Sequence, residues 1–218
     1  MLCVVGASST VLAQAFKPGE KITYNVLQMG VKVGEATLTF VGEKAYENQK
    51  ALLIVFQSKG LTFFDEEKIY LNPLTFKPLA VERDLDIFGN KEKINERYSQ
   101  GSVKIFKDAA GKRIEQTIDK AGGMDNIYAF IYRYRQSGAF KMNERFDVHL
   151  PTKDITIQLK RQVDLNNIAG QNYRAFYMES DPAKYKLWFD ASDKKLPLRI
   201  SSAIGMANTV MVMTGYEN

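Results

Sequence analysis

The sequence predicts an all-β fold that includes one helix, and two observations carry this prediction. From Phe16 onward, apolar and polar residues alternate with a period of two through most of the chain, which is typical of strands that bury one face. Glycine-containing turn signals recur at intervals of roughly ten residues, as they do between consecutive antiparallel strands. Such a meander favours a barrel or a sandwich. Only residues 124–135 depart clearly from the alternation.

The first half of the chain contains most of the expected meander. Residues 21–29 and 35–41 alternate around Gly30 and Gly34, which predicts a β-hairpin. Gly89-Asn90 is a strong signal for a second tight hairpin turn. Further strands are expected at residues 51–58, 63–71, 79–88, 91–98, 103–106 and 112–118.

Residues 124–135 carry the helical signal. The apolar side chains that fall on one helical face are Ile127, Phe130, Ile131 and Tyr134. Asp125 is the predicted N-cap, and Gly138 is predicted to end the helix. The same spacing places Tyr128, Tyr132 and Arg135 away from the apolar stripe, where they are candidate ligand-binding residues, although simple packing of aromatic side chains is the more common arrangement.

The second half returns to strands, expected at residues 144–150, 155–163, 171–178 and 207–214. Between the last two lies a hairpin over residues 184–200, which contains the only tryptophan. Leu187 and Phe189 share one face of its first strand, so Trp188 takes the other. Pro197 implies an edge or a bulge in its second strand. Trp188 and Arg199 complete the candidate ligand-binding residues.

The N-terminus indicates export. Residues 2–12 are apolar or small, and Ala13-Gln14-Ala15 is an A-x-A cleavage signal, so residues 1–15 are predicted to be a signal peptide remnant cleaved before Phe16. A buried N-terminal strand is the alternative. Cys3 is the only cysteine and would be lost with this segment, which excludes disulfides and thiolate–metal sites in the mature chain. Residues 16–218 are expected to form a single β-barrel-like domain.

Charge and motifs narrow the function classes further. The formal net charge of +5 is spread along the chain without a basic run, which argues against nucleic acid and indicates a mild preference for anionic partners such as lipid head groups. His149 is the only histidine and has no nucleophile motif to serve. Carboxylates at residues 65–67 and at Asp84 and Asp86 could supply an acid and a base, but we favour a solvent-exposed face for them.

Four segments resemble a family of bacterial exported proteins catalogued as domain of unknown function 3108. They are FKPGE at residues 16–20, GVKVGE at 30–35, the helical segment 125–135 and the tryptophan hairpin 184–200. Residues 99–123 show no feature of the family. The resemblance implies an envelope location, no established activity, and a curved antiparallel sheet that forms a half-open barrel or β-spiral around one helix (about 125–136), similar to periplasmic lipoprotein carriers.

These observations lead to a functional expectation. We expect a periplasmic, non-enzymatic protein that binds a lipid, glycolipid or other hydrophobic envelope component, with lysine and arginine at the mouth of its cleft. The alternative is a structural or protein-interaction factor in cell-envelope maintenance, with an envelope protein as partner and no small-molecule ligand. We expect a monomer, without cofactor or metal.

Overall fold

The computed structural model describes residues 15–137, 139–201 and 209–218. Fourteen strands form one antiparallel sheet in the order β8-β7-β6-β5-β4-β3-β2-β1-β14-β13-β12-β11-β10-β9. The strands of the first half are β1 (Glu20–Gln28), β2 (Val31–Tyr46), β3 (Gln49–Gly60), β4 (Phe63–Leu71), β5 (Pro78–Ile87), β6 (Asn90–Ser99), β7 (Ser102–Ala109) and β8 (Lys112–Asp119). Those of the second half are β9 (Arg145–Leu150), β10 (Lys153–Ile168), β11 (Gln171–Asp181), β12 (Lys186–Asp190), β13 (Pro197–Ser201) and β14 (Thr209–Glu217). The all-β prediction is confirmed.

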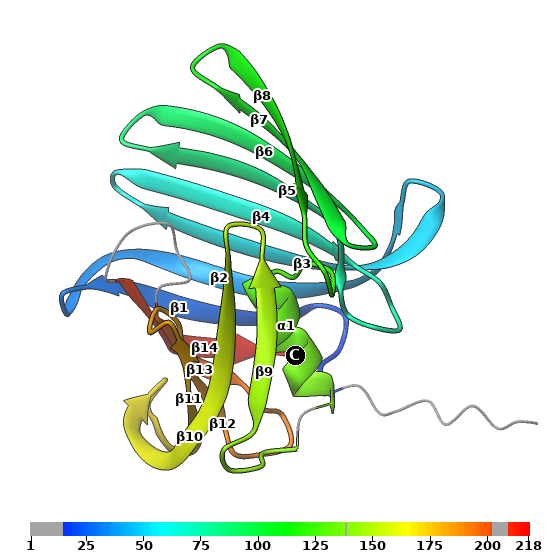
Figure 1. Ribbon diagram of the computed structural model, residues 1–218. Helices are drawn as coiled ribbons and strands as arrows, with labels where there is room; N and C mark the ends of the chain where they lie inside the picture. The colour runs from blue at the N-terminus through cyan, green and yellow to red at the C-terminus, as the bar shows by residue number, and fades with distance from the viewer. Residues whose placement is uncertain (1–14, 138, 202–208) are drawn as a thin grey trace, which may run out of the picture.

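The sheet curls around α1 (Ile127–Ser137) without closing, so that β8 and β9 remain as its two edges (Figure 1). The helix lies on the concave side, which we call the inner face, and contacts β3 and β9. This arrangement confirms the predicted half-open barrel around one helix. Within the described residues, no helix is both long enough and apolar enough to cross a membrane.

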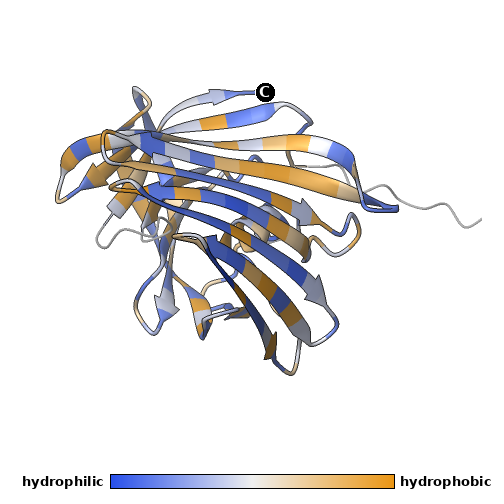
Figure 2. Ribbon diagram, turned by 90° about the horizontal axis from the view of Figure 1, so that it is seen from above, coloured by the Kyte–Doolittle hydropathy of each residue, from blue (hydrophilic) through white to orange (hydrophobic). Residues whose placement is uncertain are grey.

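Period-two alternation explains how these strands form a core. Apolar and polar residues follow one another along individual strands (Figure 2), and every second side chain of β4 is buried. The buried aromatic rings gather where the sheet meets the helix: Phe16 lies edge-on to Phe40 and to Tyr132, with ring centroids 4.7 and 4.8 Å apart. Phe56 stacks on Tyr128 at 4.4 Å. The interior next to the helix is therefore filled by side chains.

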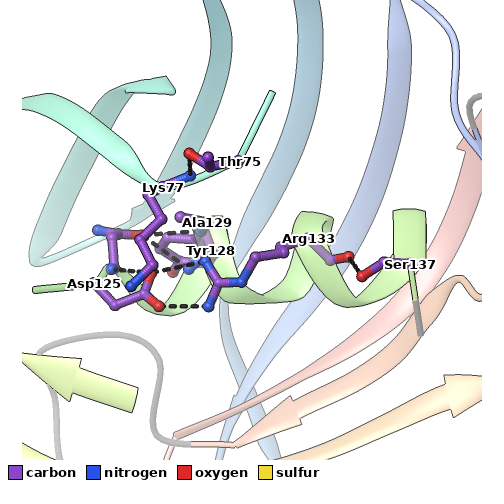
Figure 3. A network of polar contacts seen from close by, with 8 residues as sticks. Thr75, Lys77, Asp125, Tyr128, Ala129, Arg133 and Ser137 are labelled. Carbon is purple, nitrogen blue, oxygen red and sulfur yellow. Dashed lines mark hydrogen bonds and ion pairs between the residues drawn. The ribbon is translucent and has the colours of Figure 1, made fainter. Parts of the chain in front are cut away.

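The helix starts one residue later than the proposed N-cap would place it. Asn126, not Asp125, is the cap, because the Asn126 Oδ1 accepts hydrogen bonds from the backbone N–H groups of Tyr128 (2.8 Å) and Ala129 (3.3 Å). The Asp125 carboxylate instead accepts hydrogen bonds from Arg133, which lies further along the helix (Figure 3). The predicted end at Gly138 lies outside the described residues.

The tryptophan hairpin is present as predicted, with β12 and β13 paired antiparallel. Its register shifts between Trp188 and Phe189, opposite Pro197, which confirms the bulge that the proline implies. Residues 207 and 208, where the last strand was expected to begin, and residues 1–14 of the expected signal peptide lie outside the described residues. Phe16, the expected first mature residue, is buried in the core.

Strands β5–β8 differ from the rest of the sheet, and we call them the wing. They fan outward from the helix at the top of Figure 1. Side chains along β8 are almost all exposed, whereas β1 buries every second residue along most of its length. The wing is therefore a sheet extension whose inner face is not packed as tightly as the core.

Candidate functional site

The structure does not bring the five candidate ligand-binding residues together. Tyr128, Tyr132 and Arg135 are fully buried between the helix and the sheet. Trp188 and Arg199 are partly exposed on the outer face, because their neighbours in sequence point inward. The helix is buried on nearly all sides, so the face that the sequence assigned to a ligand is occupied by protein.

Trp188 and Arg199 belong to a row of side chains across the outer face. The Trp188 ring lies 4.9 Å from the Tyr177 ring, and the Arg199 guanidinium lies 5.5 Å from the Trp188 ring centroid. Arg161 covers Tyr177 in the same way at 5.3 Å. These alternating arginine and aromatic contacts stabilise each other across neighbouring strands. The row therefore explains both residues by contacts within the protein.

Arg135 has a structural partner deep inside the molecule. Its guanidinium donates two hydrogen bonds to the Glu20 carboxylate, at 2.6 and 2.8 Å, and both side chains are fully buried. It also donates to the backbone carbonyl of Lys194 and lies over the rings of Phe16 and Tyr132. With every charge paired, this cluster connects the start of β1 with the end of the helix.

A polar pocket lies at the other end of the helix, across the opening of the half-barrel. It has a volume of about 180 Å³, and we call it the mouth pocket. Its polar wall comes from β4–β6 and from the segment that leads into the helix, and Tyr185 lies opposite. The residues used below are Glu67, Arg83, Glu96, Tyr98, Asp125, Asn126 and Tyr185. Sequence elements that are far apart in the chain thus meet at one place.

The carboxylates of β4 form the base of this region. Arg83 donates hydrogen bonds to both oxygens of Asp65, at 2.7 and 2.6 Å, and its Nε lies 3.4 Å from Glu67 Oε1. Asp65 and Glu67 are buried, so the expectation of a solvent-exposed face is wrong for them. Asp84, in contrast, is exposed on the outer face as expected. The reason is register: Asp65 and Glu67 occupy inward-facing positions of β4, between the inward-facing Phe63 and Ile69.

Burial changes the acid–base properties of the pocket wall. Desolvation raises the pKa of Glu67 to about 7, although nearby Arg83 opposes this shift, and the charges of Asp65 and Glu96 add to it. Desolvation also raises the pKa of Glu96, against the effects of the Tyr98 hydroxyl, which donates to its carboxylate, and of Arg83. The wall therefore presents several hydrogen-bonding groups, and the charge of one of them, Glu67, changes near neutral pH.

The N-terminal end of the helix completes the pocket. Asn126 caps the helix with its carbonyl oxygen, and its Nδ2 donates to Glu67 Oε2 at 3.3 Å. Arg133 donates to Asp125 Oδ1 at 3.2 Å, as Figure 3 shows beside Tyr128. The buried hydroxyl of Tyr128 has no hydrogen-bond partner in the structure. The polar groups of the pocket are thus held in place by pairs within the protein.

The inner face of the wing continues from the pocket as a mixed surface, on which aliphatic side chains alternate with charged ones such as the Glu92–Lys107 ion pair. Ile94 lies opposite Arg83 in the register, and Ile105 lies opposite Glu96, so both share the face of the pocket wall. The aliphatic side chains of this face remain partly or largely exposed; they are Leu85, Ile87, Ile94, Ile105, Ile114 and Ile118. Exposed aliphatic side chains therefore adjoin a polar pocket, with one ion pair among them.

Two other chemistries, catalysis by His149 and binding of a metal ion, receive no support from the geometry of the described residues. His149 is paired with Asp154, with 3.0 Å between Nδ1 and Oδ1, and Lys120 shares the same carboxylate. No group of three or more histidine, cysteine, aspartate or glutamate side chains within the described residues is arranged to hold a metal ion.

The fold and the pocket define a class of protein: an all-β, half-open sheet that curls around one helix and has a polar pocket at its mouth. Residues 21–214 match the family described as "Protein of unknown function (DUF3108)". Because the match covers most of the chain, the chain belongs to the DUF3108 family, and the resemblance seen in the sequence is confirmed.

The other comparisons add little. No curated protein matches the chain. A crystal structure from Bacteroides fragilis, of a protein provisionally described as exported and as having a YmcC-like fold, is 10% identical in sequence. That match covers 93% of this chain and 97% of the other, with a TM-score of 0.36.

Proposed function

We propose that this protein is an exported, periplasmic binding protein of the cell envelope that holds an amphiphile without transforming it. The apolar part of the ligand lies along the inner face of the wing, and its polar group enters the mouth pocket. The observation that carries the proposal is the continuity of the two surfaces: Ile94 and Ile105 share one face with Arg83 and Glu96. A surface with exposed aliphatic side chains that leads into a small polar pocket matches the two ends of an amphiphile.

The apolar surface supports a chain rather than a compact apolar ligand. The core beside the helix is filled by aromatic rings, so it offers no room for a ligand there. The wing, in contrast, leaves aliphatic side chains partly exposed over several neighbouring strands. Covering such a surface contributes about 25 cal/mol per Å² of apolar area removed from water.

The polar pocket supports a hydrogen-bonding head group of modest size. Its volume of about 180 Å³ suits a sugar-sized or smaller group. Carboxylates of Glu67 and Glu96 accept hydrogen bonds when they are ionised and can donate one when protonated. Arg83 and Asn126 already hold Glu67, so the pocket supplies fixed polar groups for recognition, and we assign no chemical step to them.

The first experiment is direct detection of a ligand. Protein purified from a periplasm is analysed by native mass spectrometry, and its melting temperature is measured with octyl glucoside below the micelle concentration. We expect an added mass that corresponds to an amphiphile and a rise in melting temperature. Neither a bound mass nor a thermal shift would favour the alternative, a protein that works through its surface. A covalently changed ligand would contradict the non-enzymatic part of the proposal.

A pair of variants locates the binding surface. Ile114 lies on the inner face of β8 and is 55% exposed, so Ile114→Asp should leave the fold intact and weaken octyl glucoside binding about tenfold. Thr117→Asp introduces the same charge on the same strand but on the outer face, and should leave the affinity unchanged. Isothermal titration calorimetry measures both, and equal effects of the two substitutions would place the ligand elsewhere.

A further inference from the structure

Two lysines converge on one aromatic ring at the rim of the mouth pocket. Lys153 stands at the start of β10, and Lys184 precedes β12. The Lys153 ammonium lies 5.0 Å from the centroid of the Tyr185 ring, and the Lys184 ammonium lies 5.6 Å from it. Tyr185 itself is buried and lines the mouth pocket. Two positive charges are thus gathered where the pocket opens.

The ring that collects them is held firmly by the turn before β12. The Ser180 hydroxyl accepts hydrogen bonds from the backbone N–H groups of Lys184 (3.1 Å) and Tyr185 (2.9 Å). The Ser180 N–H donates to the Tyr185 carbonyl at 2.9 Å. These bonds fix the backbone that carries Lys184 and the Tyr185 ring, so the position of the ring is a property of the fold.

Neither lysine has an anionic partner among the described residues. Within residues 15–137, 139–201 and 209–218, no carboxylate forms an ion pair with Lys153 or Lys184, although nearby Lys120 is paired with Asp154. Burial, together with the neighbouring charge of Lys184, lowers the pKa of Lys153 to about 8. Two ammonium groups that repel each other gain most from a shared anion.

We infer that Lys153 and Lys184 form an oxyanion site that takes a phosphate or sulfate group of the ligand at the rim of the mouth pocket. This inference rests on the proposed function and names its ligand class: an anionic amphiphile whose charged group lies over Tyr185. The aliphatic chain then extends along the wing, and hydroxyl groups near the anion reach the polar wall of the pocket. Lysine ammonium groups bind phosphate oxygens through short, charge-assisted hydrogen bonds.

The test compares three probes by isothermal titration calorimetry: octyl phosphate, octyl glucoside and inorganic phosphate. The double variant Lys153→Gln/Lys184→Gln should lose about tenfold or more in affinity for octyl phosphate, which corresponds to one lost charge-assisted interaction. Its affinity for octyl glucoside should stay within about twofold. Lys153→Arg/Lys184→Arg keeps both charges and should retain most of the affinity for octyl phosphate.

A matched control removes the same charge elsewhere. Lys44 and Lys59 are exposed and do not line the pocket, so Lys44→Gln/Lys59→Gln should bind octyl phosphate like the unmodified protein. Equal losses in the two glutamine variants would reduce the effect to net charge and overturn the oxyanion site. Binding of both octyl compounds with no loss in the Lys153/Lys184 variant would overturn it as well, while leaving the proposed function intact.

The remaining outcomes separate the sources of the anion. Binding of inorganic phosphate as tight as that of octyl phosphate would show that a free anion, not an amphiphile, is the ligand of this site. If neither octyl compound binds, the proposed function fails, whatever inorganic phosphate does. Tighter binding of octyl phosphate than of either other probe, lost with the two lysines, is the result we expect.

Discussion

The two ends of α1 carry similar polar chemistry in different surroundings. At the C-terminal end, Arg135 and Glu20 form an ion pair that is sealed inside the core. At the N-terminal end, Arg83 pairs with Asp65 and lies near Glu67, but that cluster forms part of the wall of a pocket. We call the first the sealed cluster and the second the open cluster.

The difference teaches which polar groups are available for a ligand. In the sealed cluster, the charges are satisfied by one another and by the backbone of Lys194, so removing one leaves a buried charge with nothing to replace it. In the open cluster, Glu67 is buried and its neighbours compensate the loss of hydration only in part, so its pKa is raised to about 7. A pocket next to such a group lets a ligand supply the missing interactions.

The largest expected effect is in the sealed cluster. Arg135→Met should lower the free energy of unfolding by about 3–5 kcal/mol, because it leaves the Glu20 carboxylate buried and unpaired. Urea-induced unfolding at pH 7 measures the change. The control is Arg174→Met, because Arg174 and its partner Asp164 are both mostly exposed and the loss should be clearly smaller. Equal losses would show that the burial of the Arg135–Glu20 pair does not determine what its removal costs.

The second prediction concerns pH dependence in the open cluster. Between about pH 4.5 and pH 7, the folded protein keeps a proton on Glu67 that the unfolded chain has released, so stability falls as the pH rises through this window and levels off above it. Glu67→Gln removes this titration. We therefore expect the variant to be as stable as the unmodified protein near pH 4.5 and more stable by about 3 kcal/mol at pH 8.

The neighbouring residue supplies the control for that experiment. Glu66 lies on the outer face of the same strand, so Glu66→Gln is the matched variant that removes a carboxylate from β4 outside the open cluster. Urea unfolding at several pH values measures all three proteins. A slope that survives Glu67→Gln would assign the titration to another group, with Glu96 as the next candidate.

Much of the fold could be predicted from the sequence, because strand alternation and turns are local signals. Residues 63–71 were expected as a strand and form β4 with those same bounds. Every second residue of this strand points inward, and phenylalanine, isoleucine and leucine occupy the inward positions near its ends. The tryptophan hairpin and its proline bulge followed from neighbours in sequence in the same way. Local patterns suffice for strands because successive side chains point to opposite faces, so the order of residues alone indicates which face each one occupies.

The candidate site could be predicted only in part, because its contacts join distant parts of the chain. Arg135 meets Glu20 across 115 positions, and nothing local to the helix distinguishes such a buried partner from a ligand. One local signal does mark the buried carboxylates. Asp65 and Glu67 are separated from Phe63 and Ile69 by even numbers of residues, which places them on the same, buried face of the strand. Whether the inner face of the wing is exposed depends on which other elements pack against it, and no local residue pattern encodes that.

The smallest expected effect concerns the residue that belongs to both the helix and the open cluster. Asn126→Ala should lower the free energy of unfolding by about 1 kcal/mol, because the first turn loses the acceptor for the N–H groups of Tyr128 and Ala129. Asn126→Ser keeps an acceptor, so its loss should be only a few tenths of a kcal/mol. Urea unfolding at pH 5, where Glu67 is mostly protonated, isolates this capping effect.

The same two variants then report on the open cluster at higher pH. Both lose the hydrogen bond from Asn126 Nδ2, which favours the ionised form of Glu67, so both should raise its pKa further and steepen the fall of stability towards pH 8. A serine variant that matches the unmodified protein at pH 5 but falls behind it at pH 8 would show that the two functions of Asn126 are separable. If serine and alanine behave alike at both pH values, the cap contributes nothing and the link to Glu67 is its whole effect.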